Sequence, residues 1–148
     1  MSRGPYDLAV VGAGIVGLAH ALAARRLGKR VIVLDREAAN VGASIRNFGF
    51  VTVTGQERGR QWERALRSRD VWDDVAGPAG IANLHAGLTL AVQTQEGLEV
   101  VDSFLETEMG EGCRLLDPDT ALARYPHLAS EGLLGVLESP HERRVEAK

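Results

Sequence analysis

Three glycines and one aspartate have the types and spacing of a dinucleotide-binding turn. Gly12, Gly14 and Gly17 form a GxGxxG pattern, and Asp35 follows the first glycine by twenty-three residues. In such a turn the first glycine allows a tight bend, the second lets a diphosphate approach the backbone, and the third lets a helix pack closely. A carboxylate at position 35 can accept hydrogen bonds from both hydroxyls of an adenosine ribose, and it repels a 2′-phosphate. These residues therefore predict the binding of a dinucleotide that lacks a 2′-phosphate.

The segments around the glycines predict the elements that position them. An apolar run at residues 7–11 precedes the pattern, a helix-like segment follows it as far as Gly28, and a second apolar run at 30–34 ends on Asp35. The right-handed crossover rule makes the two runs parallel neighbouring strands. The free N–H groups and the positive dipole at the helix start would hold the diphosphate. The stripe of this helix expected to face the core comprises Ile15, Leu18, Ala19, Leu22 and Ala23.

Two further features follow the second apolar run. Arg36 suits either stacking on an adenine face or simple solvation, and its residue type fits both uses equally. Residues 42–49, GASIRNFG, combine small residues with a hydroxyl, a guanidinium and an amide. This composition suits contacts with a phosphate or a flavin edge, and it also suits an ordinary polar turn.

Composition limits the classes of function. The chain has 148 residues and a net charge of −3, with no basic run that indicates binding to nucleic acid or to a membrane surface. Cys113 is the single cysteine, which excludes an intrachain disulfide, and with no secretion signal we predict a cytoplasmic protein. Its thiol is expected to be buried and inert. His127 and His141 have no metal-ligand spacing around them, so no metal site is predicted.

The rest of the chain alternates predicted helices and strands. Residues 57–76 form an amphipathic pattern that places Trp62 and Trp72 on an apolar stripe. Asp117 is expected to cap a short helix with Pro118 at its first position, ending near Pro126. The other predicted elements are strands at 50–54, 87–94, 114–116 and 132–138, and a helix at 96–108.

Together these motifs resemble the FAD-dependent amine and amino-acid oxidoreductases, the group that includes D-amino acid oxidase, glycine oxidase and sarcosine oxidase. The resemblance rests on VVGAGIVGLAHALAARRLGKRVIVLDR and on GASIRNFGFV. It implies an α/β fold in which a Rossmann-like dinucleotide-binding βαβ unit is followed by the start of an α+β substrate domain. The implied boundaries are 1–76 for the first part of the FAD-binding domain and 77–148 for a partial substrate-binding domain.

The resemblance also implies which residues bind the cofactor FAD, with Gly17 completing the turn. The residues that would lie along the diphosphate are Gly12, Gly14, Ile15 and Val16. The residues that would hold the adenosine are Asp35 and Arg36, although the family more often has Glu at the first of these positions. The residues that would approach the diphosphate, the ribitol or the flavin ring are Ser44, Arg46 and Asn47.

The implied reaction is oxidation of a C–N bond in a small amine or amino acid, with hydride passed to FAD and an imine left for water to hydrolyse. GASIRNFGFV and GLTLAVQTQEGLEVVDSF look most like a branch linked to aminophosphonate catabolism. The chain corresponds to less than half of such an enzyme, and no catalytic residue is implied within it. A truncated chain of this kind is expected to be unstable, to self-associate or to need a complementing chain, because parallel sheets need both faces buried.

Two other functions fit part of the pattern. Asp35 would equally suit NAD in a nicotinamide-dependent dehydrogenase, although the small-residue loop and the strand-rich second half argue against that class. The chain could also be an inactive nucleotide-binding fragment, or a subunit that works only with a complementing chain.

Overall fold

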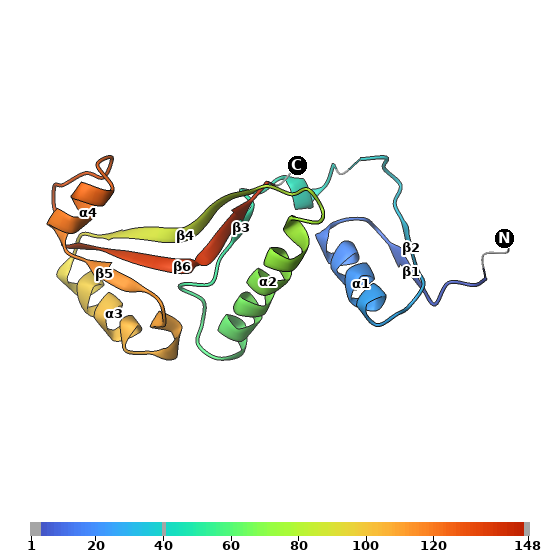
Figure 1. Cartoon of the computed structure of the whole chain (residues 1–148), viewed down its shortest axis with the longest axis horizontal. Helices are drawn as coiled ribbons and strands as arrows, with labels where there is room; N and C mark the ends of the chain where they lie inside the picture. Colours follow the sequence, from blue (N-terminus) through green and yellow to red (C-terminus); the bar gives the residue numbers. More distant parts are fainter. Residues whose placement is uncertain (1–3, 40, 147–148) are drawn as a thin grey trace. The chain divides into compact units, whose positions relative to one another are not determined.

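The structure, a computed structural model, describes residues 4–39 and 41–146, which divide into two compact units. The first unit ends at Phe48, and the second spans Gly49–Glu146. Figure 1 labels the helices and strands of both units. The predicted boundary between residues 76 and 77 concerns functional domains of a whole enzyme, and it stays a prediction.

The first unit is a βαβ unit, as predicted. It consists of β1 (Leu8–Val11), α1 (Ile15–Arg26) and β2 (Val31–Leu34). The strands pair in parallel, with Leu8 opposite Val31 and Val11 opposite Leu34. A short 3₁₀ turn, η1 (Ala43–Ile45), follows β2.

The predicted core-facing stripe of α1 is wrong for most of its residues. Ile15 and Leu18 are 48 % and 43 % exposed, and of the predicted stripe only Leu22 is half-buried. The buried residue of the helix is Ala21. At Gly17 an added Cβ would lie 2.0 Å from the carbonyl oxygen of Gly12. The helix therefore sits too close to the turn for a large side chain, and small residues occupy the face that packs inward.

The second unit contains an antiparallel sheet built around its last strand. The strands are β3 (Phe50–Val51), β4 (Asn83–Val92), β5 (Arg114–Leu116) and β6 (Gly135–Val145). Strand β6 pairs with each of the other three. Hence every strand pairing of this sheet involves β6.

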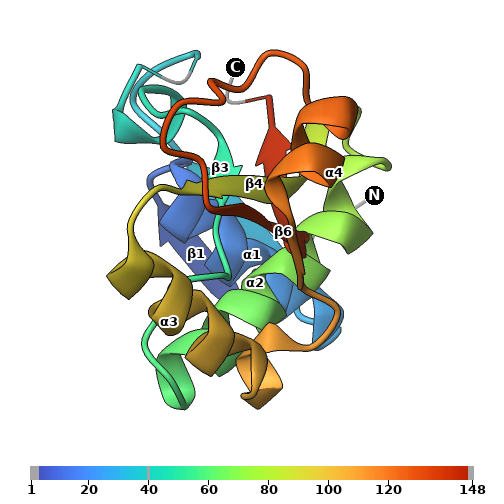
Figure 2. The ribbon, with the colours of Figure 1, turned by 90° about the vertical axis from the view of Figure 1, so that its left-hand side faces the viewer.

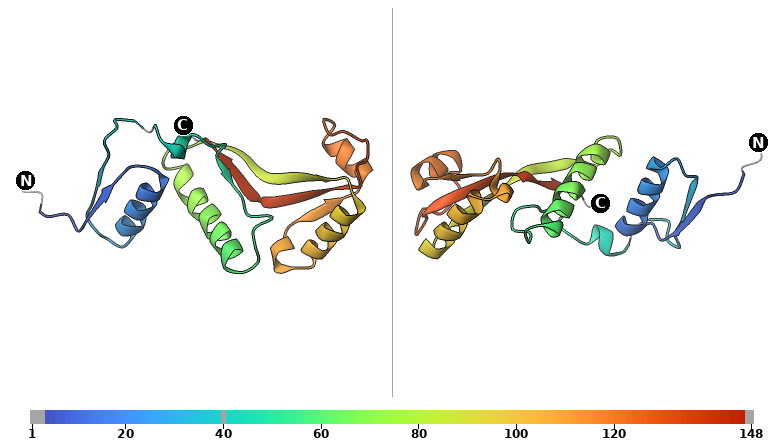
Figure 3. Two further views of the ribbon diagram at one scale, coloured as in Figure 1. Left: turned by 180° about the vertical axis from the view of Figure 1, so that it is seen from behind. Right: turned by 90° about the horizontal axis from the view of Figure 1, so that it is seen from below.

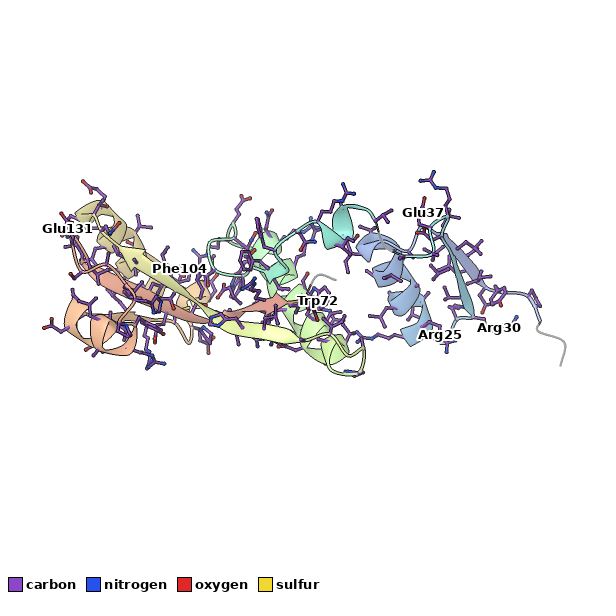
Figure 4. All side chains as sticks on the ribbon, turned by 90° about the horizontal axis from the view of Figure 1, so that it is seen from above. Arg25, Arg30, Glu37, Trp72, Phe104 and Glu131 are labelled. Carbon is purple, nitrogen blue, oxygen red and sulfur yellow. The ribbon has the colours of Figure 1, made fainter. Side chains whose placement is uncertain are left out.

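Three helices cover this sheet: α2 (Arg60–Ala76), α3 (Gln95–Leu105) and α4 (Pro118–Arg124). Helices α3 and α4 lie on opposite faces of the sheet, as Figures 2 and 3 show. Each sits over its own apolar cluster. The buried members beneath α3 are Val92, Val101 and Leu137, with Phe104 packed against them; those with α4 are Ala121, Leu133 and Val136. Figure 4 labels Phe104 on α3 and Trp72 on α2.

Most predicted elements of this unit are present, with shifted ends. The short helix predicted to end near Pro126 begins at Pro118 after the Asp117 cap as predicted, because the Asp117 carboxylate accepts the N–H of Thr120 at 3.0 Å. Residues 57–59 precede α2 rather than forming its first turn, and α3 ends at Leu105 before a 3₁₀ turn, η2 (Glu108–Gly110). The 50–54 strand is confined to its first two residues.

The largest difference is the length of β6. The sequence predicts a strand end at Glu138, whereas β6 continues through Pro140 to Val145. The register of the pairing with β4 shifts between Ala86 and Leu88, so Pro140 falls where no regular ladder bond is required. Proline lacks an N–H, and bulges are among the few sheet positions that tolerate it.

The environment of Cys113 and the apolar character of the helices test two predictions from the composition. Cys113 is half-buried, and burial raises the pKa of its thiol, which suits an inert side chain. No helix in the part of the chain that the structure describes has the length and apolar character needed to cross a membrane.

Candidate functional site

The glycine turn between β1 and α1 has the geometry expected of a phosphate-binding loop. Gly12 adopts a φ of +103°, a conformation that favours glycine, and its N–H donates to the carbonyl of Leu34 at 2.7 Å. Gly14 precedes the helix in an extended conformation, and the N–H of Leu18 donates to its carbonyl. The turn therefore ties the end of β1 to the end of β2 and starts α1 directly above it.

A hollow of about 540 Å³ runs along β1 and the first turns of α1. Its lining includes Gly12, Gly14, Gly17 and the exposed Val16. His20 also lines it, but its Nδ1 bonds the Val16 carbonyl at 2.7 Å within the helix. The glycines leave the backbone open along this hollow, which is the condition for a diphosphate to approach it.

Asp35 lies beside the turn and is fixed by two backbone donors. The N–H of Ala13 donates to Oδ2 at 2.6 Å, and the N–H of Glu37 donates to Oδ1 at 2.9 Å. The bond from Ala13, followed by the one from Glu37, lowers the pKa of this exposed carboxyl. Asp35 is thus held ionised and oriented, and each oxygen keeps a lone pair for a ribose hydroxyl.

Arg36 points into solvent and pairs with its neighbour. Its Nε donates to Glu37 Oε1 at 2.9 Å, and its side chain is 91 % exposed. Figure 4 labels Glu37 just beyond β2. Of the two predicted uses of Arg36, adenine stacking and solvation, the structure shows the solvated side chain, paired with Glu37.

Ser44 links the small-residue loop to the start of α1. The N–H of Ile15 donates to Ser44 Oγ at 2.9 Å, although the two residues are twenty-nine positions apart. Gly14 provides no side-chain cap, so this hydroxyl supplies one from a distance. A Cβ at Gly14 would lie 3.2 Å from the same Oγ. The hydroxyl therefore sits at the point where a phosphate oxygen would meet the helix, with its own proton available to donate.

The other two loop residues have different surroundings. Asn47 uses Nδ2 to donate to the Ser44 carbonyl at 2.8 Å, which closes the 3₁₀ turn on itself. Arg46 ends that turn and is exposed. The structure thus brings Asp35 and Ser44 to the glycine turn, and it brings Asn47 to the carbonyl of Ser44.

Ala13 is the residue that the sequence analysis missed. Its side chain carries no chemical signal, and its part in the site is the N–H that it gives to Asp35. Only the general rule that glycine-rich turns present backbone donors points to it. No group of three or more His, Cys, Asp or Glu side chains able to hold a metal ion occurs among residues 4–39 and 41–146.

Comparison with known proteins places the chain in a family. The family described as "FAD dependent oxidoreductase" matches residues 7–148. Aerobic glycerol-3-phosphate dehydrogenase from Staphylococcus aureus (strain USA300) is 27 % identical over 147 residues, a match that covers 88 % of this chain and 25 % of that protein.

Solved structures agree in fold. Glycine oxidase from Geobacillus kaustophilus is 25 % identical with a TM-score of 0.72, and the match covers 96 % of this chain and 41 % of that one. For glycine oxidase from Bacillus cereus ATCC 14579 the identity is 21 %, the TM-score 0.75 and the coverage 97 % and 40 %. The chain thus spans about a quarter of the length of the curated relatives and about two fifths of the solved ones. On the family match over residues 7–148, this chain belongs to the FAD dependent oxidoreductase family.

Proposed function

We propose that this chain is the N-terminal portion of an enzyme that binds FAD and oxidises a C–N bond of a small amine or amino acid. The observation that carries the proposal is the glycine turn, in which Asp35 and Ser44 converge on the backbone N–H groups of Ala13 and Ile15. Membership of an FAD dependent family makes FAD the favoured dinucleotide over NAD.

Each residue near the turn has a distinct proposed role. Gly12 and Gly14 leave the backbone open to the diphosphate, while Val16 and Gly17 offer N–H groups at the positive end of the helix. Ile15 lies along the diphosphate, with its own N–H donating to Ser44 Oγ. Asp35 accepts the ribose hydroxyls, and its lowered pKa keeps it an acceptor at neutral pH. FAD, when bound, supplies the hydride acceptor of the reaction.

The loop is proposed to add the remaining contacts. Ser44 can accept from Ile15 and donate to a phosphate oxygen at the same time, since a hydroxyl has one donor and two acceptor sites. The exposed Arg36 can cover the adenine, and Arg46 and Asn47 complete the approach to the diphosphate or the flavin. No catalytic residue is proposed within this chain.

The names of two relatives support an amino-acid substrate, because both are glycine oxidases. A second candidate is oxidation of a C–O bond in a phosphate-bearing alcohol, which the 27 % identity to a glycerol-3-phosphate dehydrogenase favours. A measurement of released ammonia distinguishes the two reactions. Oxidation of an amino acid leaves an imine whose hydrolysis yields ammonia, whereas oxidation of an alcohol yields none. A branch linked to aminophosphonate catabolism and a cytoplasmic location remain predictions from the sequence.

Completion of the fold by self-association or by a complementing chain is also proposed. Eleven large hydrophobic side chains remain exposed among the described residues of the first unit, and the chain spans about 40 % of its solved relatives. The mass of the chain in solution, measured with and without FAD, tests this directly.

The binding proposal is tested by titrating the purified chain with FAD and following flavin fluorescence and the visible spectrum. We expect saturable binding that Gly14→Val abolishes, because a branched side chain would fill the space beside Ser44 Oγ. Gly42→Ala is the matched control, since a Cβ there meets nothing within 4 Å. Unchanged FAD affinity in Gly14→Val would overturn the site, and tighter binding of NAD than of FAD would overturn the cofactor. A wild-type chain that ignores FAD would leave the inactive-fragment hypothesis standing instead.

A further inference from the structure

A second hollow lies in the second unit, on the sheet beside the end of α4. Its volume is about 320 Å³, and its lining includes His85, Gly87 and Thr89 of β4. Gly87 has a φ of +90° and sits where the register with β6 shifts. A Cβ at this position would lie 2.7 Å from the Ser139 carbonyl oxygen, so no side chain can occupy this part of the floor. Bulges of this kind recur next to functional sites.

A buried carboxylate on the neighbouring strand also lines the hollow. Glu138 of β6 is 9 % exposed. Its Oε2 accepts a hydrogen bond from Arg114 Nε at 2.5 Å, and its Oε1 accepts one from the hydroxyl of Tyr125. Arg124 Nε forms an ion pair with Oε1 at 2.9 Å. The hydrogen bond from Tyr125, then the one from Arg114 and the positive charges of both arginines, lower the pKa of Glu138. The buried carboxylate of Glu138 thus orients the guanidinium groups of Arg114 and Arg124.

Both arginines keep donors that Glu138 does not use. A guanidinium has five N–H groups, and in each bond with Glu138 only Nε takes part. Glu138 is the one acceptor that the structure shows for either guanidinium within residues 4–39 and 41–146. The side chains of Arg114 and Arg124 are 56 % and 54 % exposed, so their terminal amino groups can reach a ligand. With two cations and one anion, the cluster has a net positive charge.

We infer that this hollow binds a small oxyanion, a carboxylate or a phosphate group, through the terminal amino groups of the arginines that Glu138 orients. Guanidinium groups match the geometry of both anions and bond them in pairs of N–H donors. The hydroxyls of Thr89 and Tyr125 line the same hollow and add polar character. Every residue involved belongs to the second unit, so the inference does not depend on FAD binding.

The simpler role of the same cluster is structural. Arg124 and Tyr125 come from the end of α4, whereas Arg114 and Glu138 come from the sheet, so the bonds also fasten the helix to the strands. A purely structural cluster would stabilise the fold without binding an anion. The two roles therefore give different results in an anion titration.

The test is a titration of the full chain with sodium acetate and, separately, with sodium phosphate, at constant ionic strength set by sodium chloride. The arginine Nε–H signals and the amide signals of Gly87 and Thr89 are followed by NMR. We expect saturable shifts with at least one of the two anions, confined to this hollow. Saturation with acetate alone assigns a carboxylate ligand, saturation with phosphate alone assigns a phosphate ligand, and saturation with both assigns the broader oxyanion class. Constant ionic strength removes general screening from the comparison.

Two variants and one control complete the design. Arg124→Gln should weaken the binding at least tenfold, and Arg124→Lys should weaken it less, because lysine keeps the charge but loses the planar fork. Arg36→Gln is the control, since Arg36 pairs with Glu37 in the other unit and should leave the affinity unchanged. Shifts that rise linearly without saturation would overturn the inference, as would an anion affinity of Arg124→Gln equal to that of the wild type. Should that variant fail to fold, the lysine variant and the wild-type saturation decide.

Discussion

The two units differ in the motif that they carry and in how many hydrophobic side chains they bury. The first unit holds the glycine turn and Asp35, yet Ala21 is its one buried hydrophobic residue in the described part of the chain. The second unit contains the other ten buried hydrophobics, from Val53 to Val145. Of the large apolar side chains that stay exposed within residues 4–39 and 41–146, eleven lie in the first unit and five in the second.

This difference follows from the two kinds of sheet. A parallel pair such as β1 and β2 has both faces apolar and needs cover on each, whereas α1 can cover only one of them. The antiparallel sheet of the second unit has α3 and α4 on opposite faces, each above its own apolar cluster (Figure 2). The second unit is therefore expected to account for most of the chain's stability, and the first unit to depend on what it binds.

The most direct test compares the same substitution in both units. Leu137 is 2 % exposed in the cluster with Val92 and Val101, so Leu137→Ala should lower the free energy of unfolding by about 3 kcal/mol. Leu27 in the first unit is 77 % exposed, and Leu27→Ala should change it by less than about 0.5 kcal/mol. Urea denaturation followed by circular dichroism measures both. Equal losses in the two variants would remove the contrast between the units.

A second comparison concerns two carboxylates that each accept two backbone N–H groups. Glu142 is 6 % exposed and accepts from Val53 and Thr54, whereas Asp35 is exposed and accepts from Ala13 and Glu37. Glu142→Leu would leave two donors of the second unit without an acceptor, so it should cost about 2 kcal/mol at pH 7. Asp35→Asn should leave the stability of the second unit unchanged and weaken FAD binding instead.

The pH dependence of these variants has a defined sign. Burial raises the pKa of Glu142, but the hydrogen bonds from Thr54, Ser139 and Val53 outweigh it and lower the pKa below its usual value of 4.5. A lowered folded-state pKa stabilises the protein above the unfolded-state pKa, and this contribution is lost as pH falls through the folded value. The deficit of Glu142→Leu should therefore be full at pH 7 and shrink below about pH 4. A deficit independent of pH would mean that packing, not the charge, is responsible.

A third test concerns the close approach of α1 to the glycine turn in the first unit. A Cβ at Gly17 would lie 2.0 Å from the Gly12 carbonyl oxygen, which belongs to the backbone and cannot rotate away. Gly17→Ala should push α1 off the turn and weaken FAD binding by about tenfold, a cost of the size that overpacking brings. The control Gly42→Ala should bind FAD as the wild type does. Unfolding of the second unit, read from the same denaturation curves, should be unaffected by either substitution.

Sequence patterns predicted the local parts of both units well. The glycine spacing located β1, α1 and β2, and the Asp117–Pro118 pair located the start of α4, because turns and caps depend on a few adjacent residues. The extension of β6 through Pro140 depends instead on a bulge in a distant strand. The donors Val53 and Thr54, in a run that reads as a strand, bond a side chain nearly ninety residues away. Neither arrangement can be predicted from the residues adjacent to it in the sequence.

The candidate site shows the same limit. Gly12, Gly14 and Asp35 could be assigned from spacing alone, because a tight βαβ crossover fixes where they meet. The bond between Ile15 and Ser44 could not, since it depends on how the loop after β2 folds back on the helix. The wrong prediction of the core-facing stripe in α1 has a similar origin, because hydrophobicity predicts large inward residues where close approach requires small ones.

The smallest expected effects come from the helix caps, which also differ between the units. Thr94 caps α3 locally by accepting the N–H of Gly97 at 3.0 Å, so Thr94→Ala should cost about 1 kcal/mol of unfolding free energy. Ser44 caps α1 from across the chain, in a unit with little packed core. Ser44→Ala should therefore leave the unfolding free energy of the second unit unchanged and lower FAD affinity by a few-fold, because a donor to the diphosphate is lost. If Ser44→Ala instead bound FAD more tightly, the hydroxyl would be a competitor for the helix N–H groups, and binding would require its displacement.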